Sequence, residues 1–493
     1  MRGRPPPYRP AAAGAVRASA RRPTCAARHP RRRRPGFGRR ARPGRGRGRC
    51  PSGAASNSRL PLATSTTEAV RTGPSAPGVL TALGDDGKDG GPSTGGADNA
   101  PPPPTATGLA DSLRPLLKDP ALGPVRTASV VDVASGKRLF DAAPDRAVTP
   151  ASTVKLATAI AALSARGADH RIATRAVRGE GDRVVLVGGG DPTMTAEDLD
   201  KLAKATAKAL TGDKDKSKSE SGPKVSLGYD TSLYSGPVRH GIGPNENLAP
   251  VTPLMVNEAR LNDTSRGPAP RSADPARDAA DAFAESLSDA GVDVSGKPAE
   301  TKAPKKADRL AVHHSAPMSA LVERMLTHSD NDIGEALARQ TAVADGAPVS
   351  FAGAGDAVRK RLAKLGLRTK GTHITDGSGL DRAGKVPAEL LTRILVLAAD
   401  PERPKLRSVL TGLPIAGFSG TLDSRYADAA RGAGLVRAKT GTLTGVNTLA
   451  GSVVDADGRL LVFAFMTTGT TDRQGAQKAL DKLASSLANC GCR

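Results

Sequence analysis

The chain contains no tryptophan and few other aromatic side chains, with seven Phe and four Tyr among 493 residues. Its core must therefore be built mainly from Ala, Val, Leu and Ile. Proteins that bind single-stranded nucleic acid stack the bases on aromatic rings along a basic groove. Because this sequence offers few such rings, we expect no specific nucleic-acid partner, although the formal net charge is +23.

The positive charge is concentrated at the N-terminus. Residues 1–50 contain seventeen arginines and no lysine, aspartate or glutamate. A segment rich in Arg, Pro, Gly and Ala cannot bury enough apolar surface to fold. We therefore predict that residues 1–108 form a disordered tail and linker, which would bind polyanions only weakly and without specificity.

Cysteine is confined to the terminal segments, at Cys25, Cys50, Cys490 and Cys492. The last pair lacks a second ligand pair at zinc-finger spacing, so we expect no metal and no cofactor. We interpret these two cysteines as an exposed pair or as part of an intermolecular disulfide. No stretch approaches the ~18 apolar residues of a transmembrane helix, and the N-terminus has no continuous apolar signal-peptide segment.

Regular structure is predicted from Leu109 onward, where leucines recur on one helical face. Two hairpins are predicted, at 129–141 and 448–467, together with a strong helix that starts at Ser152 after Pro150. A low-complexity stretch at 213–221 and a Pro/Ser/Arg stretch at 266–275 interrupt the pattern. We therefore predict four segments: the tail 1–108, a first core part 109–190, an inserted region 191–311 and a second core part 312–489.

The first chemical signal is Ser152-x-x-Lys155 at the start of the predicted helix. Positions i and i+3 project from the same helical face, so the hydroxyl and the amine can meet. A serine needs a nearby base to attack a carbonyl, and a lysine with a lowered pKa can serve. Such short matches also occur by chance: Ser221 and Lys224 have the same spacing, but Gly222 and Pro223 disfavour a helix there.

Two further signals follow. Ser329-Asp330-Asn331 comes after the helix predicted from Met318, where polar residues also serve as ordinary helix caps. Lys439-Thr440-Gly441-Thr442 leads into the last hairpin, where it is either a basic strand end or an exposed strand edge that offers a cation, hydroxyls and a free backbone N–H.

The three signals occur together, in one order, each at a suitable element. The set Ser-x-x-Lys, Ser-x-Asn and Lys-Thr-Gly resembles the serine β-lactamase and penicillin-binding superfamily. The long gap between Lys155 and Ser329 is similar to that of the type-4 penicillin-binding proteins, which carry a large insertion. Further segments look like that family: Gly188–Thr193, Asp230–Pro237, Ala249–Thr252 with Asn257-Glu258, and Asp376–Leu380. The resemblance spans roughly 109–489.

This resemblance implies an α/β fold of the α+β type: a β-lactamase/transpeptidase-like core, with an antiparallel sheet between helices, interrupted by an inserted domain. It implies a serine-type D-alanyl-D-alanine carboxypeptidase, with endopeptidase activity open, that cleaves peptidoglycan stem peptides ending in D-Ala-D-Ala. β-Lactam antibiotics would be covalent inhibitors. The substrate lies outside the plasma membrane, so an extracytoplasmic location is expected in spite of the missing signal sequence.

The resemblance also implies residue roles. Ser152 would be the nucleophile and Lys155 its base, with a pKa lowered by burial and by Lys439 nearby. Ser329 would relay a proton to the leaving D-alanine, and Asn331 would hold the acyl-side peptide. The expected binding set for the substrate carboxylate consists of Lys439, Thr440, Gly441 and Thr442.

Two other functions remain open at this stage. A β-lactamase shares the acylation apparatus, and Glu258-x-x-Leu-Asn262 spells the pattern that carries the deacylating glutamate of class A β-lactamases. Here, however, Glu258 precedes Ser329 instead of following it, so we assign it to the inserted region. The second alternative is a catalytically inactive peptidoglycan-binding protein, against which the intact Ser152, Lys155 and Lys439 speak.

Overall fold

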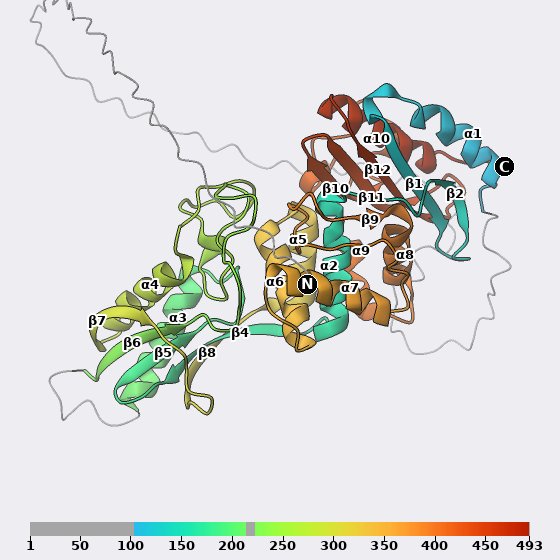
Figure 1. The fold of residues 1–493 in the computed structure, drawn as a ribbon. Coiled ribbons are helices and arrows are strands. Elements are labelled where there is room, and N and C mark those ends of the chain that lie inside the picture. The colour runs from blue at the N-terminus through green and yellow to red at the C-terminus, as the bar shows by residue number, and fades with distance from the viewer. Residues whose placement is uncertain (1–102, 213–221, 493) are drawn as a thin grey trace, which may run out of the picture. The chain divides into compact units, whose positions relative to one another are not determined.

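The computed structural model describes residues 103–212 and 222–492. The N-terminal part of the predicted tail, up to residue 102, and the charged stretch 213–221 lie outside the described residues. The described part contains two five-stranded sheets, each with its own covering helices, and a short two-stranded sheet (Figure 1).

The first sheet is antiparallel throughout and has the strand order β10-β11-β12-β1-β2. Its strands are β1 (Val125–Asp132), β2 (Arg138–Ala142), β10 (Arg437–Leu443), β11 (Val446–Val454) and β12 (Leu460–Thr468). The pairing of β1 with β12 joins the two ends of the described chain in one sheet. Both predicted hairpins are confirmed by the β1–β2 and β11–β12 pairings.

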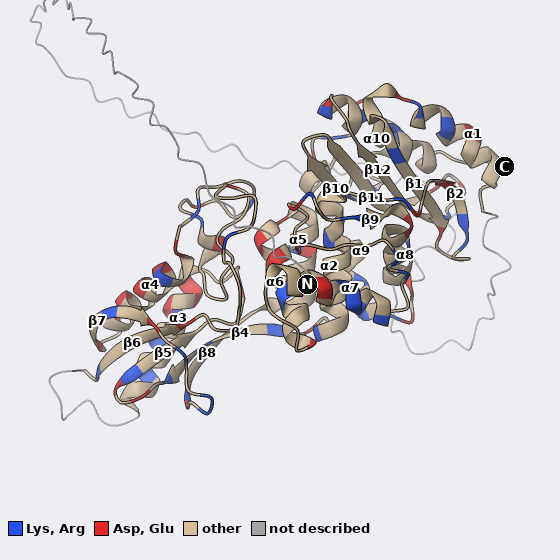
Figure 2. Ribbon diagram, viewed as in Figure 1, with Lys and Arg blue, Asp and Glu red and all other residues tan. Residues whose placement is uncertain are grey.

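Both faces of this sheet are buried. Successive side chains of a strand point to opposite faces, and nearly every residue of β11 and β12 is buried. In β12, Phe463 and Phe465 pack with helices α1 (Ala106–Leu117) and α10 (Arg473–Ala488), whereas Val462 and Ala464 join the core beneath the other helices. Figure 2 shows that β11 and β12 carry no charged residue. The sheet therefore lies between two helical layers, as the sequence predicts.

The helices that share a core with the second face come mostly from the middle of the chain. They are α2 (Lys155–Arg166), α5 (Met318–His328), α6 (Asn331–Ala344), α7 (Phe351–Lys364), α8 (Ala388–Ala399) and α9 (Ser408–Thr411). Strands β3 (Ala147–Val148) and β9 (Val386–Pro387) form the two-stranded sheet. Helix α2 is buried from Lys155 to Leu163. The α-helix begins at Lys155 and not at Ser152 as predicted, because a 3₁₀ turn over Ala151–Val154 precedes it.

The second sheet has the order β7-β6-β5-β4-β8 and mixes parallel and antiparallel pairs. Its strands are β4 (Arg171–Arg178), β5 (Arg183–Val187), β6 (Lys224–Asp230), β7 (Asp293–Glu300) and β8 (Arg309–Pro317), and its helices are α3 (Ala196–Thr211) and α4 (Pro275–Asp289). A separate core that includes Leu186, Leu202 and Phe283 lies within this part. Because β4 and β5 precede residue 191, we propose that the inserted region runs from Arg171 to Pro317.

The C-terminal cysteines differ from the expectation. Cys490 and Cys492 form a disulfide with each other within the chain, and Cys490 is buried against the α1–α10 layer instead of being exposed. Over residues 103–212 and 222–492, no helix has the length and apolar character that a membrane span requires.

Candidate active site

Ser152 is positioned by a tight turn at the entrance to α2. The preceding Ala151 has a backbone φ of 47°, a value that residues other than glycine rarely adopt. Two neighbours hold the turn: the Thr448 hydroxyl of β11 donates a hydrogen bond to the Pro150 carbonyl at 2.9 Å, and Gly379 lies so close that a Cβ there would be 2.0 Å from the Ala151 oxygen. Ser152 itself stays partly exposed.

Lys155 lies one helical turn after Ser152 and is completely buried. Its Nζ donates to three oxygens: Ser152 Oγ at 3.2 Å, Asn331 Oδ1 at 2.7 Å and the Ser378 carbonyl at 2.5 Å. The amine therefore joins the first two sequence motifs and a third segment in one cluster.

Burial lowers the pKa of Lys155 to about 8, because the protonated amine loses its hydration, and the carboxylates of Asp376 and Asp330 oppose part of that shift. The pKa of Lys439 is lowered well below its usual value by burial and by the charge of Lys155. Repulsion by the charge of Lys155 therefore lowers the pKa of Lys439, whereas burial alone accounts for the lowered pKa of Lys155.

The loop 376–381, between α7 and α8, supplies the Ser378 carbonyl. Asp376 fixes this loop by accepting hydrogen bonds from the backbone N–H groups of Gly379 and Asp381, each at 2.8 Å. Glu335 of α6 accepts from the N–H groups of Gly377 and Ser378 at 3.1 and 3.0 Å. The turn residues of Asp376–Leu380 predict a structural loop near the site. They do not predict the role of the Ser378 carbonyl, because a backbone carbonyl leaves no mark on residue type.

Ser329, Asp330 and Asn331 form the junction between α5 and α6. Ser329 ends α5 with a left-handed φ of 58°, and Asp330 caps α6 by accepting from the Ile333 N–H at 3.0 Å. The motif therefore both caps α6 through Asp330 and contacts Lys155 through Asn331. Asn331 also donates from Nδ2 to the Asn247 carbonyl at 2.9 Å, which connects it to the inserted region.

The third motif lies on β10, at the edge of the first sheet. Gly441 is required there, because a Cβ would lie 2.1 Å from Thr448 Oγ1 and 2.8 Å from the Pro150 carbonyl. The hydroxyl of Thr440 shares a hydrogen bond of 2.8 Å with Thr421. Lys439 differs from the expectation: it is 0 % exposed and its Nζ donates to the Thr440 carbonyl at 2.8 Å, so it does not reach the surface of the cleft.

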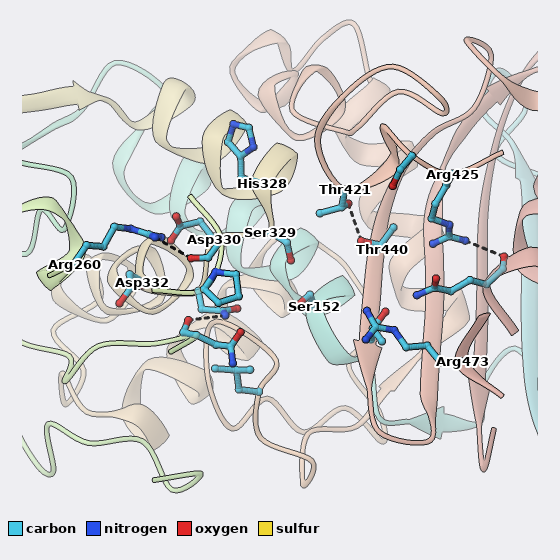
Figure 3. A pocket seen from close by; sticks show the side chains of 18 of the residues that line it. Ser152, Arg260, His328, Ser329, Asp330, Asp332, Thr421, Arg425, Thr440 and Arg473 are labelled. Atoms are coloured by element: carbon cyan, nitrogen blue, oxygen red, sulfur yellow. Dashed lines mark hydrogen bonds between the residues drawn. The ribbon is translucent and has the colours of Figure 1, made fainter. Parts of the chain in front are cut away.

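These elements surround a cleft of about 520 Å³. Five residues predicted for the site line it: Ser152, Ser329, Asn331, Thr440 and Thr442. Lys155 and Lys439 lie behind the wall. Figure 3 shows Ser152 and Ser329 next to each other in this view, with Thr440 and Thr421 on the side of the sheet.

Comparison with known proteins agrees with this geometry. The model of the D-Ala-D-Ala carboxypeptidase 3 (S13) family matches residues 109–265 and 261–489. The chain belongs to the S13 family. It is therefore a hydrolase, a D-Ala-D-Ala carboxypeptidase, as the three motifs predict.

Relatives of this S13 carboxypeptidase are similar over most of their length. A carboxypeptidase of Mycobacterium tuberculosis is 37% identical over 401 residues, which cover 79% of this chain and 85% of that protein. Carboxypeptidase DacB of Mycolicibacterium smegmatis is 36% identical and covers 80% and 87%. A D-alanyl-D-alanine carboxypeptidase from an Actinomadura species is 30% identical and covers 74% and 81%.

Among solved structures, penicillin binding protein 4 of Haemophilus influenzae superposes with a TM-score of 0.64 at 22% identity, covering 78% of this chain and 99% of that one. The predicted fold of the S13 carboxypeptidase, a transpeptidase-like core with an inserted region, is confirmed by this likeness.

Glu258 does not line the cleft of the S13 carboxypeptidase. Its buried carboxylate pairs with Arg260 at 2.8 Å and with Arg324 at 2.6 Å. Asp332 pairs with Arg271 at 2.9 Å. Carboxylate oxygens of Glu258, Asp330 and Asp332 lie within 4.8 Å of one another, and the three arginines supply the compensating charge. Glu258 is thus part of a structural ion-pair network at the contact with the inserted region.

Proposed function

We propose that Ser152 is the nucleophile of this S13 carboxypeptidase and that it attacks the carbonyl between the two terminal D-alanines of a peptidoglycan stem peptide. The observation that carries this proposal is the geometry at Lys155 Nζ, which lies 3.2 Å from Ser152 Oγ while two other oxygens fix its remaining directions.

The hydrogen-bond pattern defines how Lys155 acts as a base. A neutral amine has two N–H bonds and one lone pair. Asn331 Oδ1 and the Ser378 carbonyl can only accept, so they take the two N–H bonds. The lone pair then faces the Ser152 hydroxyl, which donates its proton to it during the attack.

In the acylation step a bond forms between Ser152 Oγ and the carbonyl carbon, and the amide C–N bond breaks. The proton leaves Ser152 for Lys155 Nζ and passes, through the Ser329 hydroxyl, to the nitrogen of the departing D-alanine. The backbone N–H groups of Ser152 and Thr442 would stabilise the oxyanion, for which one lost donor typically costs ~3 kcal/mol.

Substrate contacts follow from the cleft lining. Asn331 binds the acyl-side peptide, while the hydroxyls of Thr440 and Thr442 bind the terminal carboxylate. Lys439 would act from behind the strand, where it holds the Thr440 carbonyl. Water then attacks the ester, the bond between the carbonyl carbon and Ser152 Oγ breaks, and the serine regains its proton.

β-Lactams carry a strained amide and a carboxylate in the same relation as the D-Ala-D-Ala terminus. Their lactam C–N bond would therefore open as the carbonyl carbon bonds to Ser152 Oγ, and water would hydrolyse the resulting ester only slowly, which makes them covalent inhibitors. Because stem peptides lie outside the plasma membrane, we place the mature enzyme in the extracytoplasmic space.

The test is the intact mass of the protein after incubation with benzylpenicillin. We expect one covalent adduct on the wild type, none on Ser152→Ala, and an unchanged adduct on Ser232→Ala, an exposed serine outside the cleft. An adduct on Ser152→Ala would overturn the assignment of the nucleophile.

Release of D-alanine from a tripeptide ending in D-Ala-D-Ala tests the reaction itself. We expect release by the wild type and none by Ser152→Ala. Turnover of a chromogenic β-lactam much faster than this release would instead identify a β-lactamase, and an adduct without release would identify a binding protein.

A further inference from the structure

The terminal carboxylate of the leaving D-alanine needs a positive partner, and Lys439 is badly placed for that role. Its side chain is 0 % exposed and does not line the cleft. Its Nζ is turned to the Thr440 carbonyl, 2.8 Å away, inside the wall. A substrate carboxylate in the cleft therefore meets the hydroxyls of Thr440 and Thr442, but no exposed lysine beside them.

Four arginines line the same cleft, and three of them already have carboxylate partners. Arg260 pairs with Glu258 at 2.8 Å, Arg271 pairs with Asp332 at 2.9 Å, and Arg425 pairs with Asp481 at 2.5 Å. Arg425 also donates to the Gln477 carbonyl at 2.9 Å. These three guanidinium groups already form ion pairs within the protein.

Arg473 is the fourth arginine of the cleft and, unlike the other three, has no carboxylate partner among the described residues. It is the first residue of α10 and is exposed to solvent. Within residues 103–212 and 222–492, neither a hydrogen bond nor an ion pair to its side chain is recorded. In Figure 3 the labelled Arg473 side chain points towards the part of the view where Ser152 lies, and Arg473 lines the same cleft as Thr440 and Thr442.

We propose that Arg473 binds the terminal carboxylate of the leaving D-alanine together with Thr440 and Thr442, and that it supplies the cation there in place of Lys439. This inference rests on the proposed function of the cleft. Arg473, which lies outside the three sequence motifs, would then determine specificity for a free C-terminus.

The chemistry of the guanidinium suits this role. It is planar, remains charged at any physiological pH and presents parallel N–H groups that match the two oxygens of a carboxylate. The threonine hydroxyls would donate to the same oxygens from the strand side. A peptide whose C-terminus is amidated offers no charge to Arg473 and should gain little from it.

The experiment compares Arg473→Gln with the wild type on two substrates, a tripeptide ending in D-Ala-D-Ala as the free acid and the same tripeptide as the C-terminal amide. We expect kcat/KM for the acid to fall by about 10- to 100-fold, the range for a hydrogen bond to a charged group. The amide should change by less than about twofold, so that the preference for the acid largely disappears. Arg473→Lys, which keeps the charge but not the paired geometry, should lie between the two.

Lys482→Gln is the matched control, because it removes one positive charge from the exposed face of the same helix outside the cleft lining. Its kcat/KM for both substrates should equal that of the wild type. Thermal melts check that Arg473→Gln folds normally, as expected for an exposed side chain.

Equal losses on acid and amide, or a full acid preference in Arg473→Gln, would overturn the inference while leaving the proposed function intact. Failure of the wild type to release D-alanine from the acid would overturn both.

Discussion

At the scale of single residues, Lys155 Nζ has one reactive direction because two oxygens occupy the others. Asn331 Oδ1 and the Ser378 carbonyl lie 2.7 and 2.5 Å away, and Ser152 Oγ takes the third position. In the proposed mechanism only the neutral amine can accept a proton, so the fraction of Lys155 that is neutral would set the rate of attack.

This gives a prediction for pH. Burial lowers the pKa of Lys155 to about 8, so the amine is mostly protonated below that pH and mostly neutral above it. We expect the rate constant for acylation by benzylpenicillin to rise about tenfold per pH unit below pH 7 and to level off above pH 9. Stopped-flow measurement across this range checks it, and a rate independent of pH from 6 to 9 would contradict the role of Lys155 as base.

At the scale of elements, β10 and the 3₁₀ turn at Ala151–Val154 approach each other through a glycine. A Cβ at Gly441 would lie 2.8 Å from the Pro150 carbonyl and 2.1 Å from Thr448 Oγ1. The same Thr448 hydroxyl holds Pro150. The close approach of β10 to the turn that carries Ser152 therefore requires a residue without a Cβ at position 441.

The corresponding variant is Gly441→Ala. The added methyl should push β10 away from the turn, and misplacement by about 1 Å typically costs on the order of 100-fold in rate. Acylation by benzylpenicillin would show this loss. Gly241→Ala is the control, because nothing lies within 4 Å of a Cβ at that position; equal rates for the two variants would contradict the packing argument.

The loop 376–381 offers a second test at this scale. Asp376 holds the loop through backbone hydrogen bonds and its charge raises the pKa of Lys155. In Asp376→Asn the acylation rate should fall because the Ser378 carbonyl is less well fixed, and the midpoint of the pH profile should move below about 8. A slower enzyme with an unchanged midpoint would mean that Asp376 acts only on the fold.

At the scale of the whole molecule, the inserted region supports the second motif from behind. The Asn247 carbonyl accepts from Asn331, the Ala249 N–H donates to Asp332 at 3.0 Å, and Arg271 pairs with Asp332. The ring of His240, also in the inserted region, lies 3.1 Å from Asp376 Oδ2, so polar contacts connect the insertion both to the second motif and to the loop 376–381. Figure 1 shows the second sheet with its own helices α3 and α4.

Removing Arg271 should reveal this coupling. Arg271→Met leaves the buried Asp332 without its partner, which typically destabilises a protein by about 3 kcal/mol. Burial and Asp330 already raise the pKa of Asp332 to about 7, and Arg271 opposes that shift. A carboxyl group with a raised folded pKa contributes stability at low pH that is lost as the pH rises through that value, so the variant should be weakest above pH 7.

Urea unfolding at pH 6 and pH 8.5 measures the effect. Arg277→Met, which removes a surface pair of 3.7 Å with Asp274, should change the free energy of unfolding by less than about 1 kcal/mol at both pH values. An Arg271→Met variant as stable as this control at pH 8.5 would show that the network does not support the motif.

The sequence by itself determined the hairpins of the first sheet and the family. Alternation of apolar residues fixed the hairpins of the first sheet, and the order of Ser152-x-x-Lys155, Ser329-x-Asn331 and Lys439-Thr-Gly identified the family, because residue type and spacing record both. Its predicted boundary of the insertion at residue 191 remains a prediction, and strands β4 and β5 of the second sheet precede that residue.

Only the tertiary structure decided which groups face the cleft. Burial depends on packing between distant segments, so the sequence could not show that Lys439 lies inside the wall while Arg473, outside all three motifs, reaches the cleft. Nor could it show the role of the Ser378 carbonyl, since every residue has one and only folding brings this one to Lys155.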